Sequence, residues 1–233
     1  MISFLLQILA LLFFIYLISQ YNIKLLSRLI YTYKPTKTVV LKLLALLFLV
    51  GTFIHEMGHL LIAELLMVRT DDLNLIPEIK DKSNFKLGGV KIQATDPVRR
   101  TIIGLAPVLL GLIIIWVASG LWTSLASYSW YKILYVFLLF QVGHTMFSSR
   151  QDLQGALIGL FIIVLLFVLG YLLNQIIVLD LFIQVREAIS QFLQDGLPTL
   201  IRGLVNTLII ILVFTTILLV LGLFKRNSSL KGQ

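Results

Sequence analysis

His55-Glu56-Met57-Gly58-His59 is an H-E-x-x-H sequence, and it lies inside an apolar run that extends from Val39 to Val68. Residues four apart share one face of a helix, so His55 and His59 can bind one metal ion together. Glu56 is the proton-transfer group in sites of this kind. Two imidazoles favour zinc, and a catalytic zinc keeps one coordination position open for water. The sequence therefore predicts one bound Zn2+ per chain, with Glu56 as the catalytic base.

The surroundings of this stretch strengthen the prediction. Imidazoles and carboxylates are costly inside a membrane span, and where they occur they usually serve a function. The chain contains only three histidines, and two of them lie in this one stretch. The alternative is that both histidines are structural and satisfy each other or a neighbouring helix. The spacing and the adjacent Glu56 favour the metal site.

The composition is that of a multi-pass membrane protein. Of the 233 residues, 59% are hydrophobic and 13% are charged, and the mean hydropathy is +1.00. A soluble domain of this size carries more charge. The formal net charge of +8 is typical of basic loops beside an anionic lipid bilayer, and we predict no nucleic-acid partner. The chain has no cysteine, so any metal ligands must be His, Asp or Glu.

Six apolar runs are long enough to cross a bilayer, which takes about 20 residues. The predicted fold is therefore an all-α polytopic membrane protein with about six transmembrane helices. The first run lacks a basic segment before it, and we interpret it as a retained span rather than a signal peptide. The predicted spans are Ile2–Ser19, Val39–Val68, Ile102–Trp122, Tyr131–Phe147, Leu153–Leu173 and Leu200–Phe224.

The longest polar connection, Arg69–Arg100, predicts a small β-hairpin over residues 70–95, between the second and third spans. Two apolar runs, Leu73–Ile79 and Phe85–Gln93, flank a turn-like segment of charged and small polar residues. Adjacent glycines in the second run indicate a bulge or a close approach of another backbone. An exposed strand edge here can bind an extended peptide by strand addition. The predicted substrate-binding residues are Phe85, Gly88, Gly89 and Val90.

We predict three parts along the chain. Residues 1–38 contain the first span and a basic connection, residues 39–175 form a catalytic membrane core, and residues 176–233 contain an interfacial helix and the last span. The segment Ile176–Phe192 is amphipathic, and it lies along the membrane interface or packs against the end of the bundle. The distribution of Lys and Arg favours a cytoplasmic hairpin and cytoplasmic termini, in a protein of the cell membrane.

A catalytic zinc needs a third protein ligand, and the sequence offers three candidates. Glu64 points away from both histidines at 100° per helical residue, so it is a poor ligand. Asp152 follows a short polar break between two apolar runs, and it is either a metal ligand in a broken helix or an ordinary helix-start aspartate. His144 is a ligand, a donor to the oxyanion of an attacked carbonyl, or structural. We favour a role for His144 in supporting the site or the oxyanion over direct ligation.

From about Val39 to Leu173 the chain resembles the site-2 protease family of intramembrane zinc metalloproteases. The strongest match is the H-E-x-x-H sequence within a span, followed by the polar connection with its predicted hairpin. Gly104-Leu105-Ala106-Pro107 resembles the Gly-Pro motif of that family, and Ser148–Gly155 resembles the motif that supplies the third ligand. The outer spans are not diagnostic of the family.

The resemblance implies that His55, His59 and Asp152 bind zinc and that Glu56 is the base. The chain departs from the family in the residues around Asp152 and in lacking the Asn that often follows the Gly-Pro motif. The expected function is hydrolysis of a peptide bond in or near a transmembrane segment of a membrane-protein substrate. The alternative is a non-proteolytic zinc-binding membrane protein, such as a pseudoprotease or a chaperone. A transporter is disfavoured because the chain shows no inverted repeat.

Overall fold

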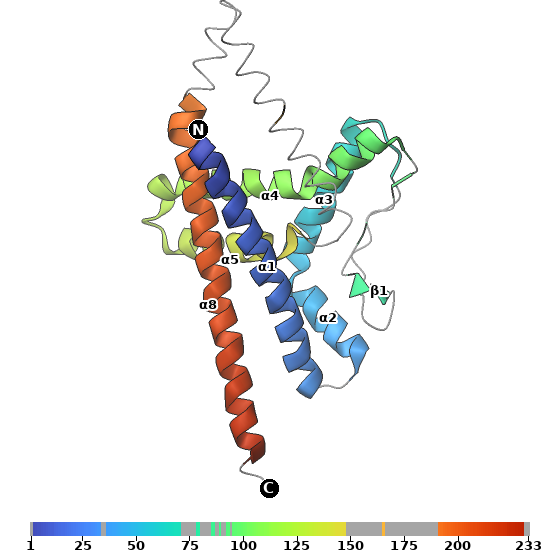
Figure 1. Ribbon diagram of the computed structural model, residues 1–233, viewed down its shortest axis with the longest axis vertical. Helices are drawn as coiled ribbons and strands as arrows, with labels where there is room; N and C mark the ends of the chain where they lie inside the picture. The colour runs from blue at the N-terminus through green and yellow to red at the C-terminus, as the bar shows by residue number, and fades with distance from the viewer. Residues whose placement is uncertain are drawn as a thin grey trace, which may run out of the picture.

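The computed structural model describes residues 2–33, 36–70, 78–79, 85–86, 89, 92–93, 95–147, 165 and 191–230. These residues are mainly helical, as the sequence predicts (Figure 1). Two short strands, β1 (Glu78–Ile79) and β2 (Phe85–Lys86), lie between the third and fourth helices. One π-helical turn, Phe192–Gly196, precedes the last helix. The helices are α1 (Ile2–Tyr33), α2 (Lys37–Leu47), α3 (Leu49–Leu65), α4 (Pro97–Leu125), α5 (Ser129–Thr145) and α8 (Leu197–Leu230).

Three helical stretches of the described part are long and apolar enough to cross a membrane. They are Leu6–Thr32, Pro97–Trp122 and Gln194–Leu223, and α2 with α3 makes a fourth if that bent pair is one span. The predicted fourth span coincides with α5, which has 17 residues. The predicted fifth span, Leu153–Leu173, lies outside the described residues except for position 165. The described part therefore accounts for three or four of the six predicted spans.

The first helix is longer than its sequence predicts. α1 continues to Tyr33, through most of the segment that we predict as a basic connection after Ser19. Residues 20–33 contain no glycine or proline, and Pro35 follows the end of the helix. Nothing in this segment interrupts the backbone hydrogen bonds, so its charged residues extend the helix instead of ending it. α8 likewise exceeds its predicted bounds at both ends.

The predicted second span is two helices instead of one. α2 and α3 are bent by 76° at a break that contains Phe48, and the bend is visible between the light-blue α2 and the cyan α3 in Figure 1. No proline or glycine precedes the break within α2, so local sequence does not explain it. The cause lies in a contact with α5 that only the tertiary structure supplies.

The end of α3 is defined by its backbone. Met67 has φ 56°, the left-handed conformation that commonly ends a helix. The N–H of Met67 donates to the carbonyl of Glu64 at 2.9 Å, and the N–H of Val68 donates to that of Ala63 at 2.8 Å. These two bonds satisfy carbonyls that the helix end would otherwise leave open. α3 therefore stops at Leu65, three residues before the predicted end of the span.

The start of α4 is set by Asp96. Its carboxylate accepts hydrogen bonds from the N–H groups of Val98 at 3.1 Å and Arg99 at 3.0 Å, and Pro97 occupies the first turn, where its missing N–H costs nothing. The N–H of Arg99 holds the pKa of the Asp96 carboxyl below its usual value. The helix consequently begins five residues before the predicted Ile102.

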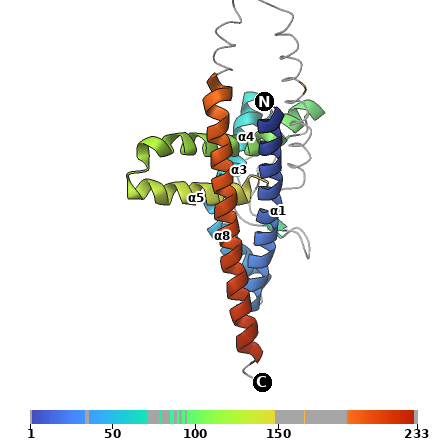
Figure 2. The same ribbon diagram turned by 60° about the vertical axis from the view of Figure 1, so that its left-hand side comes forward.

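The helices cross instead of forming one parallel bundle. α1 and α8 run side by side, and α4 and α5 form a helical hairpin that crosses them (Figure 2). Glycine allows two close contacts, because a Cβ on Gly143 would lie 2.6 Å from Thr207 and one on Gly203 would lie 2.4 Å from Ser119. The main apolar core lies at this crossing and includes Ile15, Leu105, Val108, Ile115, Val142, Met146, Leu204 and Ile211.

The described strand residues pair as an antiparallel ribbon. Glu78 lies opposite Lys86, and Ile79 lies opposite Phe85. An isolated bridge joins Thr70 to Ile92, and so brings the end of α3 toward the start of α4. The rest of the predicted hairpin, including its turn, lies outside the described residues. Its full extent therefore stays a prediction.

Candidate metal centre

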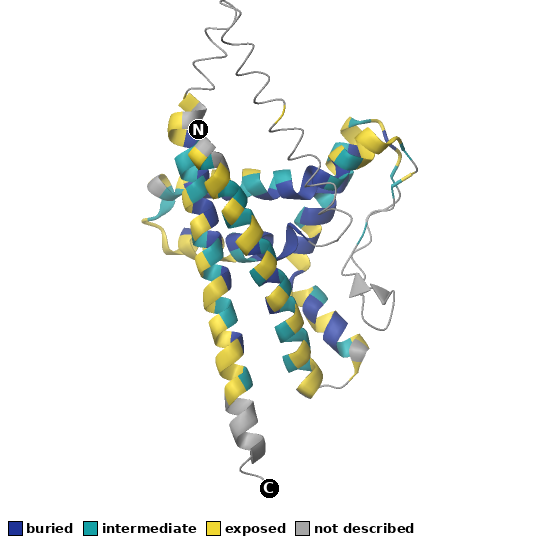
Figure 3. Ribbon diagram, in the orientation of Figure 1, coloured by how far each residue is buried: buried dark blue, intermediate teal, exposed yellow. Residues whose placement is uncertain are grey.

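α3 carries the H-E-x-x-H residues on its buried face. The exposed fractions of His55, Glu56 and His59 are 3%, 4% and 7%, whereas Phe53 and Leu61 on the other face are 43% and 48% exposed. The imidazole rings of His55 and His59 have centroids 5.0 Å apart and planes at 82°. The predicted sharing of one helical face is therefore observed, and both imidazoles are among the buried residues of α3. Figure 3 shows the buried and exposed stretches of this helix in dark blue and yellow.

One hydrogen bond fixes the tautomer of a neutral His59 imidazole. Its Nδ1 lies 2.9 Å from the backbone carbonyl oxygen of Ile103 on α4. A carbonyl oxygen can only accept, so Nδ1 carries the proton and Nε2 carries the lone pair that a metal ligand needs. Metal-binding histidines almost always donate their other ring N–H in this way. The contact thus gives His59 the tautomer and the ring orientation that metal binding requires.

The Ile103 carbonyl is available because of Pro107. In a helix, the N–H of residue 107 would donate to the carbonyl of residue 103, and proline has no N–H. Pro107 lies inside α4, so Ile103 lacks its helical donor and accepts from His59 instead. Pro107 therefore has a physical role in this chain: it leaves the Ile103 carbonyl as an acceptor for His59, a predicted metal ligand.

Gly58 lets the two helices approach closely enough for this bond. A Cβ at Gly58 would lie 3.0 Å from Cα and 3.1 Å from N of Pro107, so any side chain there would meet the backbone of α4. Metal binding by an H-E-x-x-H sequence does not require a glycine at either of its variable positions. In this chain, the glycine is required by helix packing.

Pro107→Ala is expected to change stability and zinc affinity in opposite directions. The alanine N–H would restore the helical bond to Ile103, and removal of a proline from a helix interior relieves a cost of about 3 kcal/mol. The same N–H would compete with His59 for the carbonyl, so zinc affinity should fall about 10-fold, the lower end for loss of such a partner. Thermal unfolding and zinc titration of the purified protein measure the two effects. A stabilised variant with unchanged zinc affinity would contradict the role given to Ile103.

The described residues include only part of the predicted zinc site. Among residues 2–33, 36–70, 95–147, 191–230 and the few described between them, no group of three His, Cys, Asp or Glu side chains could hold a metal. Two imidazoles and a neighbouring carboxylate are nevertheless the donor set that fits zinc. Glu64 is exposed, in agreement with its assignment as a poor ligand. Asp152, the predicted third ligand, lies outside the described residues.

His144 belongs to a buried hydrogen-bond network that links three helices. Its Nδ1 donates to the Phe140 carbonyl at 2.9 Å, and its Nε2 lies 3.2 Å from Nδ2 of Asn22 on α1. Asn22 also donates to the Ile211 carbonyl at 3.2 Å and accepts from Oγ1 of Thr215 at 2.8 Å, both on α8. Both ring nitrogens of His144 are thus engaged, and the network satisfies every polar atom of the Asn22 side chain.

These contacts favour the structural interpretation of His144. The imidazole also stacks on Phe48, at 5.3 Å between ring centroids, and so touches the break that precedes the H-E-x-x-H helix. Ligation or donation to an oxyanion would require Asn22 to give up its contact with Nε2. The oxyanion role stays a prediction. Sequence reasoning missed Asn22 because it lies between Gln20 and Lys24, in a segment that we predict as a connection.

The predicted substrate-binding residues are described only in part. Phe85 lies in β2, and Gly89 takes part in an isolated β-bridge. Gly88 and Val90 lie outside the described residues. Their role as a peptide-binding edge therefore stays a prediction.

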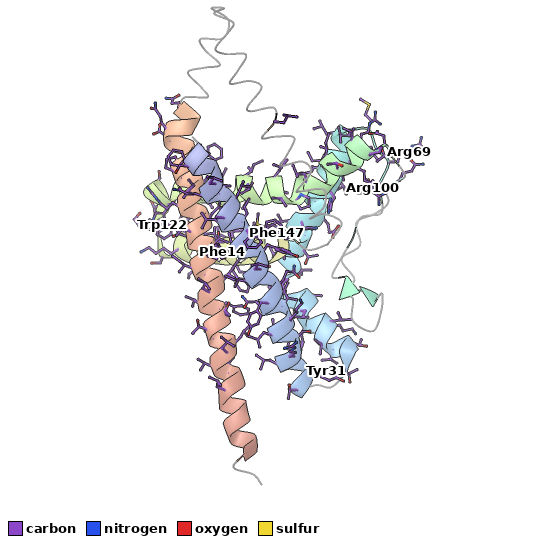
Figure 4. The ribbon with its side chains drawn as sticks, viewed as in Figure 1. Phe14, Tyr31, Arg69, Arg100, Trp122 and Phe147 are labelled. Carbon is purple, nitrogen blue, oxygen red and sulfur yellow. The ribbon has the colours of Figure 1, made fainter. Side chains whose placement is uncertain are left out.

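Charged residues lie beside the candidate metal centre, where α3 ends and α4 begins. Arg69 and Arg100 both lie at this end (Figure 4), both are exposed, and the backbone carbonyl of Arg69 accepts from the N–H of Gln93 at 3.1 Å. His59 is six residues before Leu65, or about 9 Å at helical rise. The candidate metal centre is therefore close to a charged surface.

Comparison of the chain with known protein families, with curated proteins and with solved structures finds no match.

Proposed function

We propose that the protein is an intramembrane zinc metalloprotease that hydrolyses a peptide bond in or near a transmembrane segment of a membrane-protein substrate. One observation carries the proposal: His55, Glu56 and His59 are buried together on α3, with His59 held by the Ile103 carbonyl in its metal-binding tautomer. Buried imidazoles and a carboxylate in an apolar helix are costly unless they serve a site. We include Asp152 as the third ligand.

The proposed reaction assigns a distinct task to each residue. His55 and His59 would hold the zinc, which when bound polarises a carbonyl and makes water more acidic. Glu56 would take the proton from the attacking water and return it to the leaving nitrogen. Burial of Glu56 limits its contact with bulk water. The Ile103 carbonyl would keep the His59 ring in one orientation throughout.

The substrate must be presented in an extended form. Carbonyls of a helix are engaged in its own hydrogen bonds, so a transmembrane substrate has to unwind before its peptide bond can react. We propose that the strand edge around Phe85 and residues 88–90 binds the unwound segment by strand addition. Water would enter from the charged end that carries Arg69 and Arg100, over the short distance left by the early end of α3.

The apolar helices support a membrane location. Three helical stretches are compatible with a membrane protein, and we propose a multi-pass protein of the cell membrane with cytoplasmic termini. Exposed apolar side chains on α1, α4 and α8 fit contact with lipid tails. The partners proposed are the lipid bilayer and a membrane-protein or peptide substrate.

Metal content and cleavage together test this function. The wild-type protein, purified in detergent, is expected to contain about one zinc and to cleave a generic single-span substrate; a chelator should abolish cleavage and added zinc restore it. Asp152→Ala should lower the zinc content, because a catalytic site needs three protein ligands. Wild-type protein without tightly bound zinc would refute the proposal. Zinc bound without any cleavage would select the non-proteolytic alternative.

A further inference from the structure

We infer that Gln141 is a positioning residue that sets the direction of α3 by replacing one backbone hydrogen bond at the break after α2. The side chain lies on α5 and is only 2% exposed. Its Oε1 accepts from the N–H of Gly51 at 3.1 Å, and its Nε2 donates to the carbonyl of Leu47 at 2.8 Å. In an uninterrupted helix, those two backbone groups would bond to each other.

One backbone hydrogen bond before the inserted Gln141 amide and one after it keep the helical pattern, from residue i to residue i−4. The N–H of Phe48 donates to the Leu44 carbonyl at 3.0 Å, and the N–H of Thr52 donates to the Phe48 carbonyl at 2.8 Å. The Gln141 side-chain amide therefore lies between the Gly51 N–H and the Leu47 carbonyl, a donor and an acceptor of the same helical turn. Insertion of a side chain into the helical ladder is a known cause of a sharp kink, and it accounts for the 76° bend.

Three neighbouring features keep α5, and with it Gln141, close to the break. A Cβ at Gly51 would lie 2.7 Å from the Gln141 backbone oxygen, so glycine is needed for the close approach. Thr145 Oγ1 donates to that same oxygen at 2.9 Å. Phe48 is fully buried and stacks on Phe140, with ring centroids 5.9 Å apart. The break is therefore built into the α3–α5 contact.

The bend matters because it comes one to two turns before the metal-site residues. His55 and Glu56 follow Gly51 on the same rigid helix, so the direction of α3 decides where they lie relative to α4. Straightening the chain at Phe48 would swing α3 away from the Ile103 carbonyl that orients His59. The functional consequence of this inference rests on the proposed zinc protease, whereas its structural claim does not.

Spin labels measure the bend directly. The chain has no cysteine, so Thr38→Cys and Leu61→Cys, both at exposed positions, give one labelled pair across the break. In Gln141→Met the Leu47 carbonyl and the Gly51 N–H lose the amide and can bond to each other. Helical rise and the 76° bend give a lengthening of about 7 Å on full straightening. A pulsed dipolar distance measurement that gives the wild-type distribution in Gln141→Met would overturn the inference.

Gln141→Glu provides a second test of the inference if Gln141→Met does not fold. At about pH 4 the glutamic acid is protonated, and it then offers one acceptor and one O–H donor like the amide. We expect the wild-type distance in this variant at that pH, which a general loss of packing would not restore. A lengthened or broadened distance there would overturn the inference.

Asn206→Leu is the matched control. It also removes a side-chain amide bond between helices, from Asn206 Nδ2 to the Tyr135 hydroxyl at 2.8 Å, but away from the break, so the labelled distance should not change. Zinc titration of the same variants separates the two proposals. Absence of zinc in the wild type would refute the metal site and leave the distance result intact. An unchanged distance in Gln141→Met would refute the role of Gln141 in the bend and leave the metal site intact.

Discussion

Glu56→Gln is expected to retain zinc and to lose cleavage of a membrane substrate by about 10²- to 10⁴-fold in kcat, the usual contribution of a general base. Glutamine has nearly the shape of glutamate but cannot accept a proton, so the buried site keeps its packing while proton transfer fails. Zinc content and turnover of one preparation measure both effects. The expected result is a metal-loaded, folded and inactive protein.

Glu64→Gln provides the control for this prediction. It makes the same chemical change on the same helix, at an exposed carboxylate that the proposed reaction does not use. Its zinc content and turnover are expected to equal those of the wild type. Undiminished turnover in Glu56→Gln would refute the assignment of the base, and equal losses in both variants would point to a general effect of charge on α3.

Gly58→Leu is expected to destabilise the protein by about 1–3 kcal/mol, the usual cost of overpacking, and to weaken zinc binding by about 10- to 100-fold. The physical reason is the close approach of Gly58 to the backbone of α4. A Cβ at this position would lie 3.0 Å from Cα of Pro107, and backbone cannot move aside as a flexible side chain can. The added side chain would force α4 from α3 and lengthen the 2.9 Å bond between His59 and Ile103. Thermal unfolding and zinc titration measure the two losses.

Gly120→Leu is the matched control on α4. A Cβ there meets no atom within 4 Å in the described part of the chain, so the same change in side-chain size should leave stability and zinc affinity near the wild-type values. If Gly58→Leu bound zinc as tightly as the wild type, the close α3–α4 contact would not be what orients His59.

Much of the candidate site is predictable because it is local in sequence. His55 and His59 are four residues apart, so any helix brings them to one face, and their burial follows from the apolar run around them. The mainly helical fold and the apolar helices follow from hydropathy in the same way. Asp152 is different, since any contact with the predicted metal would depend on the path of a chain segment that lies outside the described residues.

The boundaries of the helices were less predictable. Hydropathy places the end of the first helix at Ser19, ahead of the polar and charged residues that follow, although the hydrogen bonds of a helix continue until a proline or another interruption stops them, and no proline precedes Pro35. The break at Phe48 lies within a continuous apolar run and has no local signal. Its cause, the amide of Gln141, is more than ninety residues later in the sequence.

The sequence by itself determined that His55 and His59, the two predicted metal ligands, share a helical face, because helical periodicity is a property of the local backbone. Only the tertiary structure decided how those residues are oriented. Pro107 leaves a carbonyl without its helical donor, Gly58 lets that carbonyl approach His59, and Gln141 bends the chain ahead of His55. Each of these depends on which helices meet, and hydrogen bonds between distant segments are decided by packing and not by local periodicity.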